Sequence, residues 1–266
     1  MSKPAHVEND ATVSNATRSL GMQEHTYPIM YEVEDAHWWY AGRRRIVESL
    51  VSAICQTLKT QRPAILDVGC GTGANLELLA RFGEVEGVDI SDDALSFCRQ
   101  RGYTNVRRGA AQLLPFEDNV FDLVTALDVV EHLDDDLESL REMRRVLKPN
   151  GRALLFVPAF MFLWGVQDDV SNHRRRYTLK ELLSVATEAG FEIERASYAN
   201  ITFFVPILLV RTLMRITRMR TATEFKINIP VFNGLFGRIF GAERFWLRHG
   251  SFPLGVSAFC IARRVD

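Results

Sequence analysis

A short apolar segment that runs into three alternating glycines constrains the fold of this chain most. Residues 65–73 read Ile-Leu-Asp-Val-Gly-Cys-Gly-Thr-Gly, and a helix-forming segment, 74–82, follows. Glycine lacks a Cβ atom, so the backbone can turn tightly and approach a ligand closely. The N–H groups at the start of the next helix are free to bind that ligand. The segment therefore predicts a buried strand, a ligand-binding turn over Gly69, Gly71 and Gly73, and a helix.

Two acids accompany this turn. Asp67 lies at the end of the first predicted strand, and Asp89 closes the next one, 85–89. An acid at the end of the second strand of a βαβ unit commonly accepts the ribose hydroxyl groups of an adenosine. The charge of Asp67 suits a ligand with an amine better than one with a pyrophosphate. Taken alone, the motif also fits an NAD-dependent oxidoreductase, or a tight turn that binds nothing.

Composition places the chain among globular proteins with one sizeable core. Its 266 residues are 47% hydrophobic and 24% charged, and a net charge of −1 gives no general attraction to nucleic acid. The four cysteines form no Cys-x-x-Cys pair, which argues against disulfides or a zinc site and favours a reducing compartment. No signal peptide is evident, and the polar, aperiodic residues 1–25 are predicted to be disordered.

Strands and helices alternate through the middle of the chain. An amphipathic helix is predicted at 43–58. The strands predicted after it are 64–68, 85–89, 104–108, 121–127 and 151–157, and the helices are 74–82, 92–101, 134–147 and 178–189. Lys148-Pro149-Asn150-Gly151 predicts a helix stop and a turn. This alternation predicts an α/β fold with a parallel sheet covered by helices on both faces.

The C-terminal part departs from that alternation. Two more strands, 191–199 and 252–262, are predicted with about fifty residues between them. This insert opens with an apolar run, 201–210, too short to span a bilayer, and 201–250 holds eight arginines or lysines against two acids. An apolar stripe with basic flanks fits a helix lying in a membrane interface. A lid over a substrate pocket, or a dimer surface, explains the same pattern.

Several segments together resemble the class I S-adenosylmethionine-dependent methyltransferases. They occur in that family's order over residues 60–200 and are the glycine segment 65–73, the acidic strand end 87–91, Leu-Pro-Phe at 114–116, Asn-Val-Phe-Asp-Leu-Val at 119–124, Val-Glu-His-Leu at 130–133 and 145–151. The resemblance implies a doubly wound, Rossmann-like sheet of seven strands with an antiparallel last strand and an α-helical insert before it. The parts expected are a disordered tail (1–25), a helical cap (26–60), the cofactor-binding core (61–200), the apolar and basic insert (201–250) and the last strand (251–266).

The resemblance also implies how S-adenosylmethionine would be held. Gly69, Gly71 and Gly73 would wrap its methionine part, with Asp67 near the ammonium group. Asp89 would bind the ribose hydroxyl groups. These roles are carried over from the family residue by residue onto the matching positions.

The adenine end departs from the family. Ile90 would pack on adenine, and Ala126 or Leu127 would offer a backbone carbonyl at the end of its strand. The family usually has Gly-Asp-Ala before Leu-Pro-Phe, whereas this chain has Gly-Ala-Ala-Gln, so Ala110 cannot accept a bond from the adenine amino group. We expect Gln112 to substitute, or the backbone and packing around Ala111 to hold adenine alone.

Methyl transfer from a sulfonium needs chiefly an oriented acceptor and the exclusion of water. A base is needed only where the acceptor must lose a proton, and the candidates are Asp128, His132 and His173. Asp128 lies where open α/β sheets bind ligands, outside the carboxyl ends of the strands. Each candidate also has a non-catalytic explanation. Asp128 could cap a helix, and His132 could have a structural role. His173 could form a salt bridge with Asp168.

Two flanking segments, 34–44 and 168–178, resemble those of an uncharacterised bacterial subgroup of the family. Their aromatic and basic residues form the predicted substrate-binding set: Trp38, Trp39, Tyr40, Arg43, Arg176 and Tyr177. The aromatic rings would line an acceptor pocket or cover the sulfonium by cation–π attraction, unless they only pack the N-terminal helix. The arginines would clamp a phosphate or carboxylate, unless they are only solvated.

These features predict a methyltransferase that uses S-adenosylmethionine, without a metal ion, on a small-molecule, lipid or lipid-linked acceptor. An NAD-dependent oxidoreductase would explain the glycines but not the Leu-Pro-Phe and Val-Glu-His-Leu segments. A non-catalytic scaffold with the same fold is kept open by Ala110. We expect a cytoplasmic protein with no nucleic-acid partner, which could touch the inner membrane face through 201–220. The oligomeric state stays open.

Overall fold

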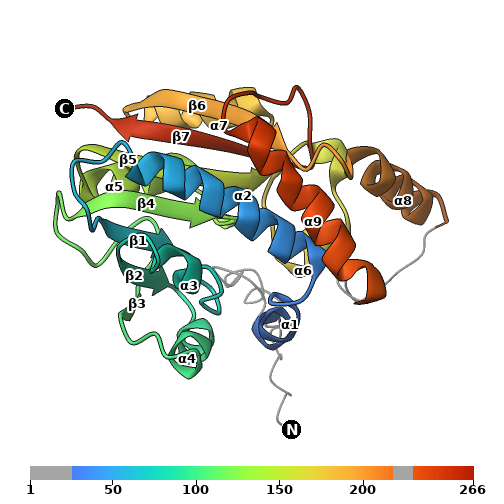
Figure 1. The fold of residues 1–266 in the computed structure, drawn as a ribbon, viewed down its shortest axis with the longest axis horizontal. Helices are drawn as coiled ribbons and strands as arrows, with labels where there is room; N and C mark the ends of the chain where they lie inside the picture. Colours follow the sequence, from blue (N-terminus) through green and yellow to red (C-terminus); the bar gives the residue numbers. More distant parts are fainter. Residues whose placement is uncertain (1–25, 218–229) are drawn as a thin grey trace, which may run out of the picture.

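The computed structural model describes residues 26–217 and 230–266, and its centre is a seven-stranded sheet in the order β3-β2-β1-β4-β5-β7-β6 (Figure 1). The strands are β1 (Ala64–Val68), β2 (Glu84–Asp89), β3 (Val106–Arg108), β4 (Phe121–Leu127), β5 (Leu147–Pro158), β6 (Phe191–Ala199) and β7 (Ser257–Arg264). Strands β1 to β5 pair in parallel, whereas β7 is antiparallel to both β5 and β6. The predicted doubly wound sheet with an antiparallel last strand is confirmed.

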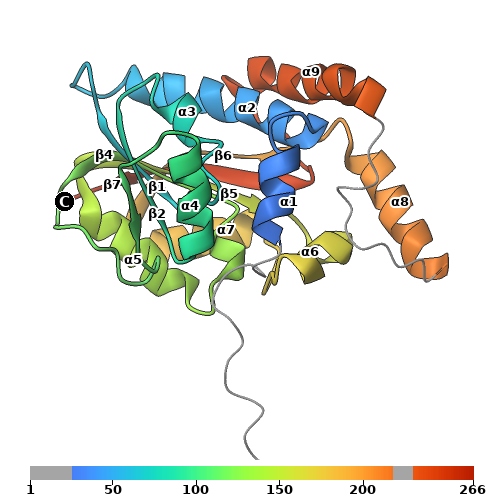
Figure 2. The same cartoon turned by 90° about the horizontal axis from the view of Figure 1, so that it is seen from below.

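Helices cover both faces of this sheet (Figure 2). They are α1 (Thr26–Val33), α2 (Trp38–Cys55), α3 (Leu76–Leu79), α4 (Asp92–Gln100), α5 (Asp136–Val146), α6 (Val166–Val170), α7 (Leu179–Glu188), α8 (Phe204–Thr217) and α9 (Pro230–Leu247), with the short 3-10 helices η1 (Val130–His132) and η2 (Met161–Leu163). Successive strand side chains point to opposite faces. Ile65 and Leu123 thus pack on the α2–α9 side, while their neighbours Leu66 and Val124 join α5 and α7.

Most predicted elements are present, and the differences lie at their ends. Helix α2 begins five residues earlier than the predicted start at 43, because His37 caps it with Nδ1, which accepts from the Trp39 N–H at 3.3 Å. Helix α3 is shorter than 74–82, since the glycine turn and the return to β2 occupy the rest. Strand β7 begins after 252, because Pro253 cannot donate to a central ladder.

The turn predicted at 148–151 lies inside β5. Helix α5 ends at Val146 as predicted, and Asn150 takes the left-handed conformation with φ 63°. The register between β4 and β5 then slips, so that Leu147 pairs with Phe121 and Arg152 with Leu123. The segment is therefore a bulge within a long strand, because sheet pairing resumes on both sides of it.

The described part of the 201–250 insert consists of α8 and α9. Helix α9 packs along α2, where a Cβ on Gly42 would collide with the fully buried Phe240. The buried Glu243 of α9 accepts hydrogen bonds from the N–H groups of Asn200 (2.6 Å) and Thr202 (2.9 Å), so α9 fixes the connection from β6 to α8. None of the described helices is long and apolar enough to cross a bilayer. Residues 1–25 and Arg218 and Arg220 lie outside the described residues.

Candidate functional site

A cavity of about 460 Å³ lies at the carboxyl ends of the parallel strands. Its walls come from α1, α2 and α8 and from the loops that follow β1, β2 and β4. Helices α1, α6 and α8 lie beyond that end of the sheet (Figure 1). Open α/β sheets bind ligands at this edge, and the volume is ordinary for a small-molecule site.

The glycine turn forms one wall of this cavity. Gly69, Gly71 and Gly73 have φ values of 66°, 56° and 86°, which L-residues with a side chain rarely adopt. A Cβ on Gly69 would lie 2.5 Å from Val129 Cγ2, whereas one on Gly71 would enter open space, with Met30 Cε nearest at 3.9 Å. Gly69 and Gly71 line the cavity, and Gly73 packs behind them on Cys98.

Asp89 is fixed at the cavity wall by the backbone. Its carboxylate accepts hydrogen bonds from the N–H groups of Gly71 and Ser91, both at 2.9 Å. The side chain is buried, and burial raises its pKa above the ordinary value. The carboxylate thus has one orientation, suited to a hydroxyl-bearing ligand.

Asp67 lies behind the turn and does not line the cavity. The Thr125 hydroxyl donates to its Oδ1 at 2.6 Å, and Oδ2 has no hydrogen-bond partner among the described residues. Burial raises the pKa of Asp67 to about 7. A buried carboxylate oxygen without a partner beside a glycine turn fits a ligand that brings an ammonium group.

The predicted adenine-binding residues Ile90, Ala111, Gln112 and Leu127 all line the cavity, together with Ala110. The loop that carries three of them is closely packed. A Cβ on Gly109 would lie 2.6 Å from Pro115 Cδ, and the Gly109 N–H donates to the Asp89 carbonyl at 3.0 Å. At the position where the family usually has the carboxylate of an Asp, this chain therefore has the methyl group of Ala110, on a backbone that is fixed by these contacts.

Sequence analysis did not identify how α1 closes the cavity. Tyr27, Met30 and Glu34 line it. Glu34 is buried and accepts from the Thr72 hydroxyl, and Arg101 Nη2 donates to it at 2.8 Å. Arg101 Nε also donates to the Thr72 carbonyl at 3.1 Å, so the C-terminal end of α1 is tied both to the glycine turn and to the residue that follows α4. This tie joins residues far apart in the sequence, so no local pattern indicated it.

The aromatic and basic residues of α2 face the same cavity. Trp38, Trp39, Tyr40 and Arg43 line it. Arg43 forms an ion pair with Asp128, and its guanidinium lies over the Trp39 ring at 4.7 Å. Burial lowers the pKa of Arg43 to about 10. The structure thus pairs Arg43, which was predicted to bind an anionic group, with Asp128, which was predicted as a base.

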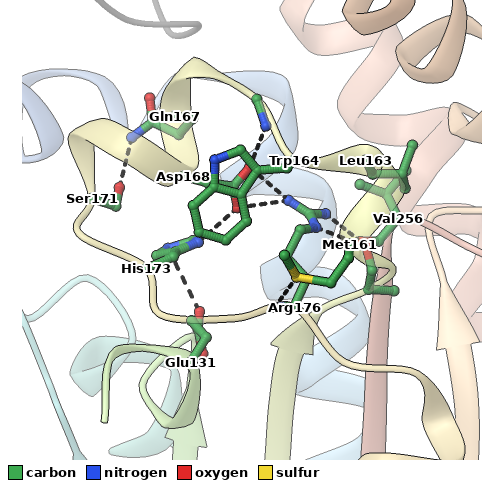
Figure 3. Close-up of polar contacts among 12 residues, drawn as sticks. Glu131, Met161, Leu163, Trp164, Gln167, Asp168, Ser171, His173, Arg176 and Val256 are labelled. Carbon is green, nitrogen blue, oxygen red and sulfur yellow. Dashed lines mark hydrogen bonds and ion pairs between the residues drawn. The ribbon is translucent and has the colours of Figure 1, made fainter. Parts of the chain in front are cut away.

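Asp168 organises the opposite wall (Figure 3). It is almost fully buried and accepts from Arg176 Nη1 at 2.8 Å and from the Gly165 N–H at 2.7 Å, and His173 Nδ1 lies 2.8 Å from it. Burial raises the pKa of Asp168, but the hydrogen bond from His173 and the charge of Arg176 outweigh it and lower the pKa to about 2. His173 and Arg176 line the cavity in fixed orientations.

His132 lies against His173, with ring centroids 4.7 Å apart and planes nearly perpendicular. Burial lowers the pKa of His132 to about 3 and raises that of the neighbouring Glu131 to about 8. The Tyr177 hydroxyl instead donates to Asp136 at 2.7 Å and lies away from the cavity walls. Of the predicted site residues, Asp67, Gly73 and Tyr177 do not line the cavity, and all the others do.

Comparisons with known proteins agree with this geometry. Residues 66–155 match the family model described as a methyltransferase domain. A Mycobacterium tuberculosis protein named a probable S-adenosylmethionine-dependent methyltransferase is 30% identical over 197 residues, 71% of this chain and 68% of its own length. The uncharacterised methyltransferase YcgJ of Bacillus subtilis is 36% identical over 148 residues, 52% of this chain and 58% of its own length.

The crystal structure of YcgJ has the same fold. It superimposes with a TM-score of 0.53 at 21% identity and covers 82% of this chain and 98% of its own. The similarity to the mycobacterial protein over about two thirds of both chains, the sheet order and the glycine turn agree with one another. The chain belongs to the S-adenosylmethionine-dependent methyltransferase family, and its cofactor is S-adenosylmethionine.

Proposed function

We propose that the protein transfers a methyl group from S-adenosylmethionine to a small-molecule, lipid or lipid-linked acceptor that is apolar in part. The two faces of α8 carry the acceptor part of this proposal. One face lines the cavity with Pro206, Ile207, Val210 and Met214. The other face exposes a second apolar row, Val205, Leu209, Leu213 and Ile216. The same helix therefore presents apolar side chains both to the cavity and to the protein surface.

The aromatic wall supports an apolar acceptor. Phe203 lies 4.7 Å from Trp38 and 5.4 Å from Phe236, measured between ring centroids, and all three line the cavity. Aromatic rings bury large apolar areas, so a hydrocarbon or ring system is the acceptor portion that gains most here. Arg43 and Arg176 are already paired with acids, which favours neutral over strongly anionic groups at their positions.

The cofactor residues take the roles that the family implies. Gly69 and Gly71 hold the methionine part, Asp67 lies near the ammonium group, and Asp89 binds the ribose. Adenine packs on Ile90 and Ala111, with the Gln112 amide and the Leu127 carbonyl within its part of the wall. The roles of the glycines, Asp89 and the adenine-binding residues are supported by the walls of the cavity and by the orientation of Asp89. The role of Asp67, which lies behind the wall, is supported by its buried Oδ2, which has no hydrogen-bond partner among the described residues.

S-adenosylmethionine supplies an activated methyl group, so the chain has to position the acceptor and remove a proton where one must leave. His173 is the base we favour, because Asp168 holds its Nδ1 and leaves Nε2 toward the site. Asp128 is the weaker candidate, because Arg43 neutralises it. The α1 cap and the α2 aromatic residues exclude water.

We further propose that α8 touches a lipid surface. Val205, Leu209, Leu213 and Ile216 recur at helical spacing and are 58%, 63%, 59% and 75% exposed. Arg215 Nη2 donates to the carbonyls of residues 162 and 164 at 3.1 and 3.2 Å, which ties the helix to η2. An exposed apolar row on a tethered helix is typical of an interfacial contact.

The cofactor proposal is tested by calorimetry with S-adenosylmethionine and S-adenosylhomocysteine. We expect saturable binding that Asp89→Ala abolishes and that Asp92→Ala, at an exposed acid nearby, leaves intact. Thermal shift with NAD in parallel separates the oxidoreductase alternative, because the true ligand raises the melting temperature by mass action. Unchanged binding in Asp89→Ala would refute the ribose role.

The membrane proposal is tested by co-sedimentation with anionic liposomes at low salt. We expect the wild-type protein to pellet and Leu209→Glu to remain in the supernatant. Thr187→Glu, on an exposed position of α7, adds the same charge away from α8 and should pellet like the wild type. Failure of the wild type to pellet would remove the lipid surface from the proposal and leave methyl transfer unaffected.

A further inference from the structure

We propose that Glu131, His132 and His173 form a site for a divalent transition-metal ion of the zinc type at the acceptor side of the cavity. Each offers one ligand atom, and these atoms lie within 4.8 Å of one another. The two histidines come from different parts of the chain, η1 and the loop before α7. This departs from the sequence-based expectation that no metal ion is involved.

The distances suit a metal after a small adjustment. His173 Nε2 lies 3.9 Å from Glu131 Oε1. Protein ligands lie about 2.0–2.2 Å from zinc, so two ligands of one ion are separated by roughly 3.3–4.2 Å. Side-chain movements of about half an ångström would bring all three atoms into this range.

The carboxylate of Glu131 is the second observation that points to a ligand. The side chain is fully buried, and neither carboxylate oxygen has a hydrogen-bond partner among the described residues. Figure 3 shows it directed toward His173. Buried carboxylates are normally paired, hydrogen-bonded or bound to a metal, because leaving one unsatisfied is costly. A cation between Glu131 and the histidines would satisfy it.

Both histidines are already oriented as metal ligands usually are. His173 Nδ1 bonds the Asp168 carboxylate at 2.8 Å, which leaves Nε2 as the donor atom for a metal. His132 has a hydrogen bond to the backbone of Ser171, while its Nδ1 has no partner in the described chain. Metal-bound histidines typically bond a carboxylate or backbone carbonyl through the other ring nitrogen, and this fixes the tautomer.

The open side of the site faces the acceptor. His132 and His173 line the cavity, whereas Glu131 lies behind them. Three protein ligands leave positions free for an oxygen of the acceptor, such as a hydroxyl or carboxylate. A bound ion would orient that oxygen and lower the pKa of a hydroxyl. It would also occupy the Nε2 lone pair of His173, so in the metal-bound protein the ion, and not His173, would promote loss of the acceptor's proton. Two imidazoles and one carboxylate favour zinc, cobalt, iron or manganese over magnesium or calcium.

Metal binding is measured without an acceptor, so this test does not depend on the methyl-transfer proposal. The full chain, stripped with a chelator, is titrated with Co²⁺ while its visible absorption is followed, and with Zn²⁺ by calorimetry. We expect one ion per chain. Glu131→Gln and His173→Ala should each weaken binding at least tenfold, and Asp168→Asn about 10- to 100-fold through His173.

The matched control is His249→Ala, which removes an exposed histidine of the segment after α9 and should bind as the wild type does. Circular dichroism and affinity for S-adenosylhomocysteine identify variants that fold. Should Glu131→Gln fail to fold, Asp168→Asn and His173→Ala decide the matter. A wild type that binds no Co²⁺ at millimolar concentration, or folded variants that bind like the wild type, would overturn the site.

Discussion

At the scale of single residues, two buried acids at neighbouring strand ends differ in how they are satisfied. Asp89 is held by two backbone N–H groups at the cavity wall, whereas within 26–217 and 230–266 the carboxylate of Asp67 accepts from the Thr125 hydroxyl alone. Asp67 therefore has the less satisfied carboxylate of the two, and its ionisation destabilises the fold when no cation lies beside it. If the ammonium group of the cofactor lies beside Asp67, this loss of stability occurs only in the cofactor-free protein.

The pH dependence of stability tests this. The folded-state pKa of Asp67 is about 7 against an ordinary 3.8, so the folded state holds a proton that the unfolded state has released between these values. The contribution of Asp67 to stability should thus fall as the pH rises from about 4 to 7 and then level off. Asp67→Asn cannot ionise and should be more stable than the wild type at pH 8, by at most about 4 kcal/mol.

The difference should shrink toward zero near pH 4, measured by urea unfolding without cofactor at several pH values. Asp92→Asn, at an exposed acid, should show no such trend. Equal stability of wild type and Asp67→Asn at pH 8 would mean that the carboxylate is solvated or paired after all.

At the scale of secondary-structure elements, the packing of α9 on α2 decides what the insert can do. Gly42 admits Phe240 and Gly241 admits the Arg45 side chain, where a Cβ would lie 2.6 Å from Arg45 Cδ. Together with Glu243, these contacts fix α9 to the core, so α8 is the described helix of the insert with the fewest restraints. None of the side chains of Phe204–Thr217 is fully buried.

Gly42→Ala should therefore destabilise the protein, by about 1–3 kcal/mol, because the added methyl group overpacks the contact with Phe240. The control is Gly234→Ala on α9, where no atom of the described part of the chain lies within 4 Å of the added Cβ. There alanine should stabilise by about 0.5–1 kcal/mol through helix propensity. Thermal unfolding of both variants checks the sign, and a neutral Gly42→Ala would show that the two helices are free to move apart.

At the scale of the whole molecule, the N-terminal cap and the sheet close the cavity together. Arg101 pairs with Glu34 at 2.8 Å and lies over the Tyr31 ring at 4.6 Å, although it is not itself a cavity wall. The cap is thus held by Arg101, the residue that follows α4, and not by a residue of the cavity wall. Cofactor binding and cap closure should be linked.

Arg101→Ala should weaken S-adenosylhomocysteine binding by roughly tenfold, because the freed cap reduces the population of the closed state. Arg99→Ala, at an exposed position in the last turn of α4, should bind as the wild type does. Calorimetry measures both. Identical affinities would show that the cap closes without this tie.

The sequence predicted what local patterns encode. The glycine turn, Asp89 and the strand ends follow from spacing along one segment, and the family resemblance supplied the antiparallel last strand. The cap depends on the contact between Glu34 and Arg101, which are 67 residues apart, and the Glu131 cluster on the contact between Glu131 and His173, which are 42 residues apart. Periodic patterns in a sequence do not indicate contacts over such separations. Tyr177 was predicted to bind substrate from its neighbours in the sequence, whereas its hydroxyl is used by Asp136.

The interior position of β7 has a consequence for how the protein is made. This strand is the partner of both β5 and β6, and among the described strands β6 has no other neighbour in the sheet. A growing chain on the ribosome must therefore carry an unpaired β5 edge and an unattached β6 until residues 257–264 emerge. Unpaired edges invite aggregation, so synthesis should depend on chaperones up to that point and be sensitive to premature stops.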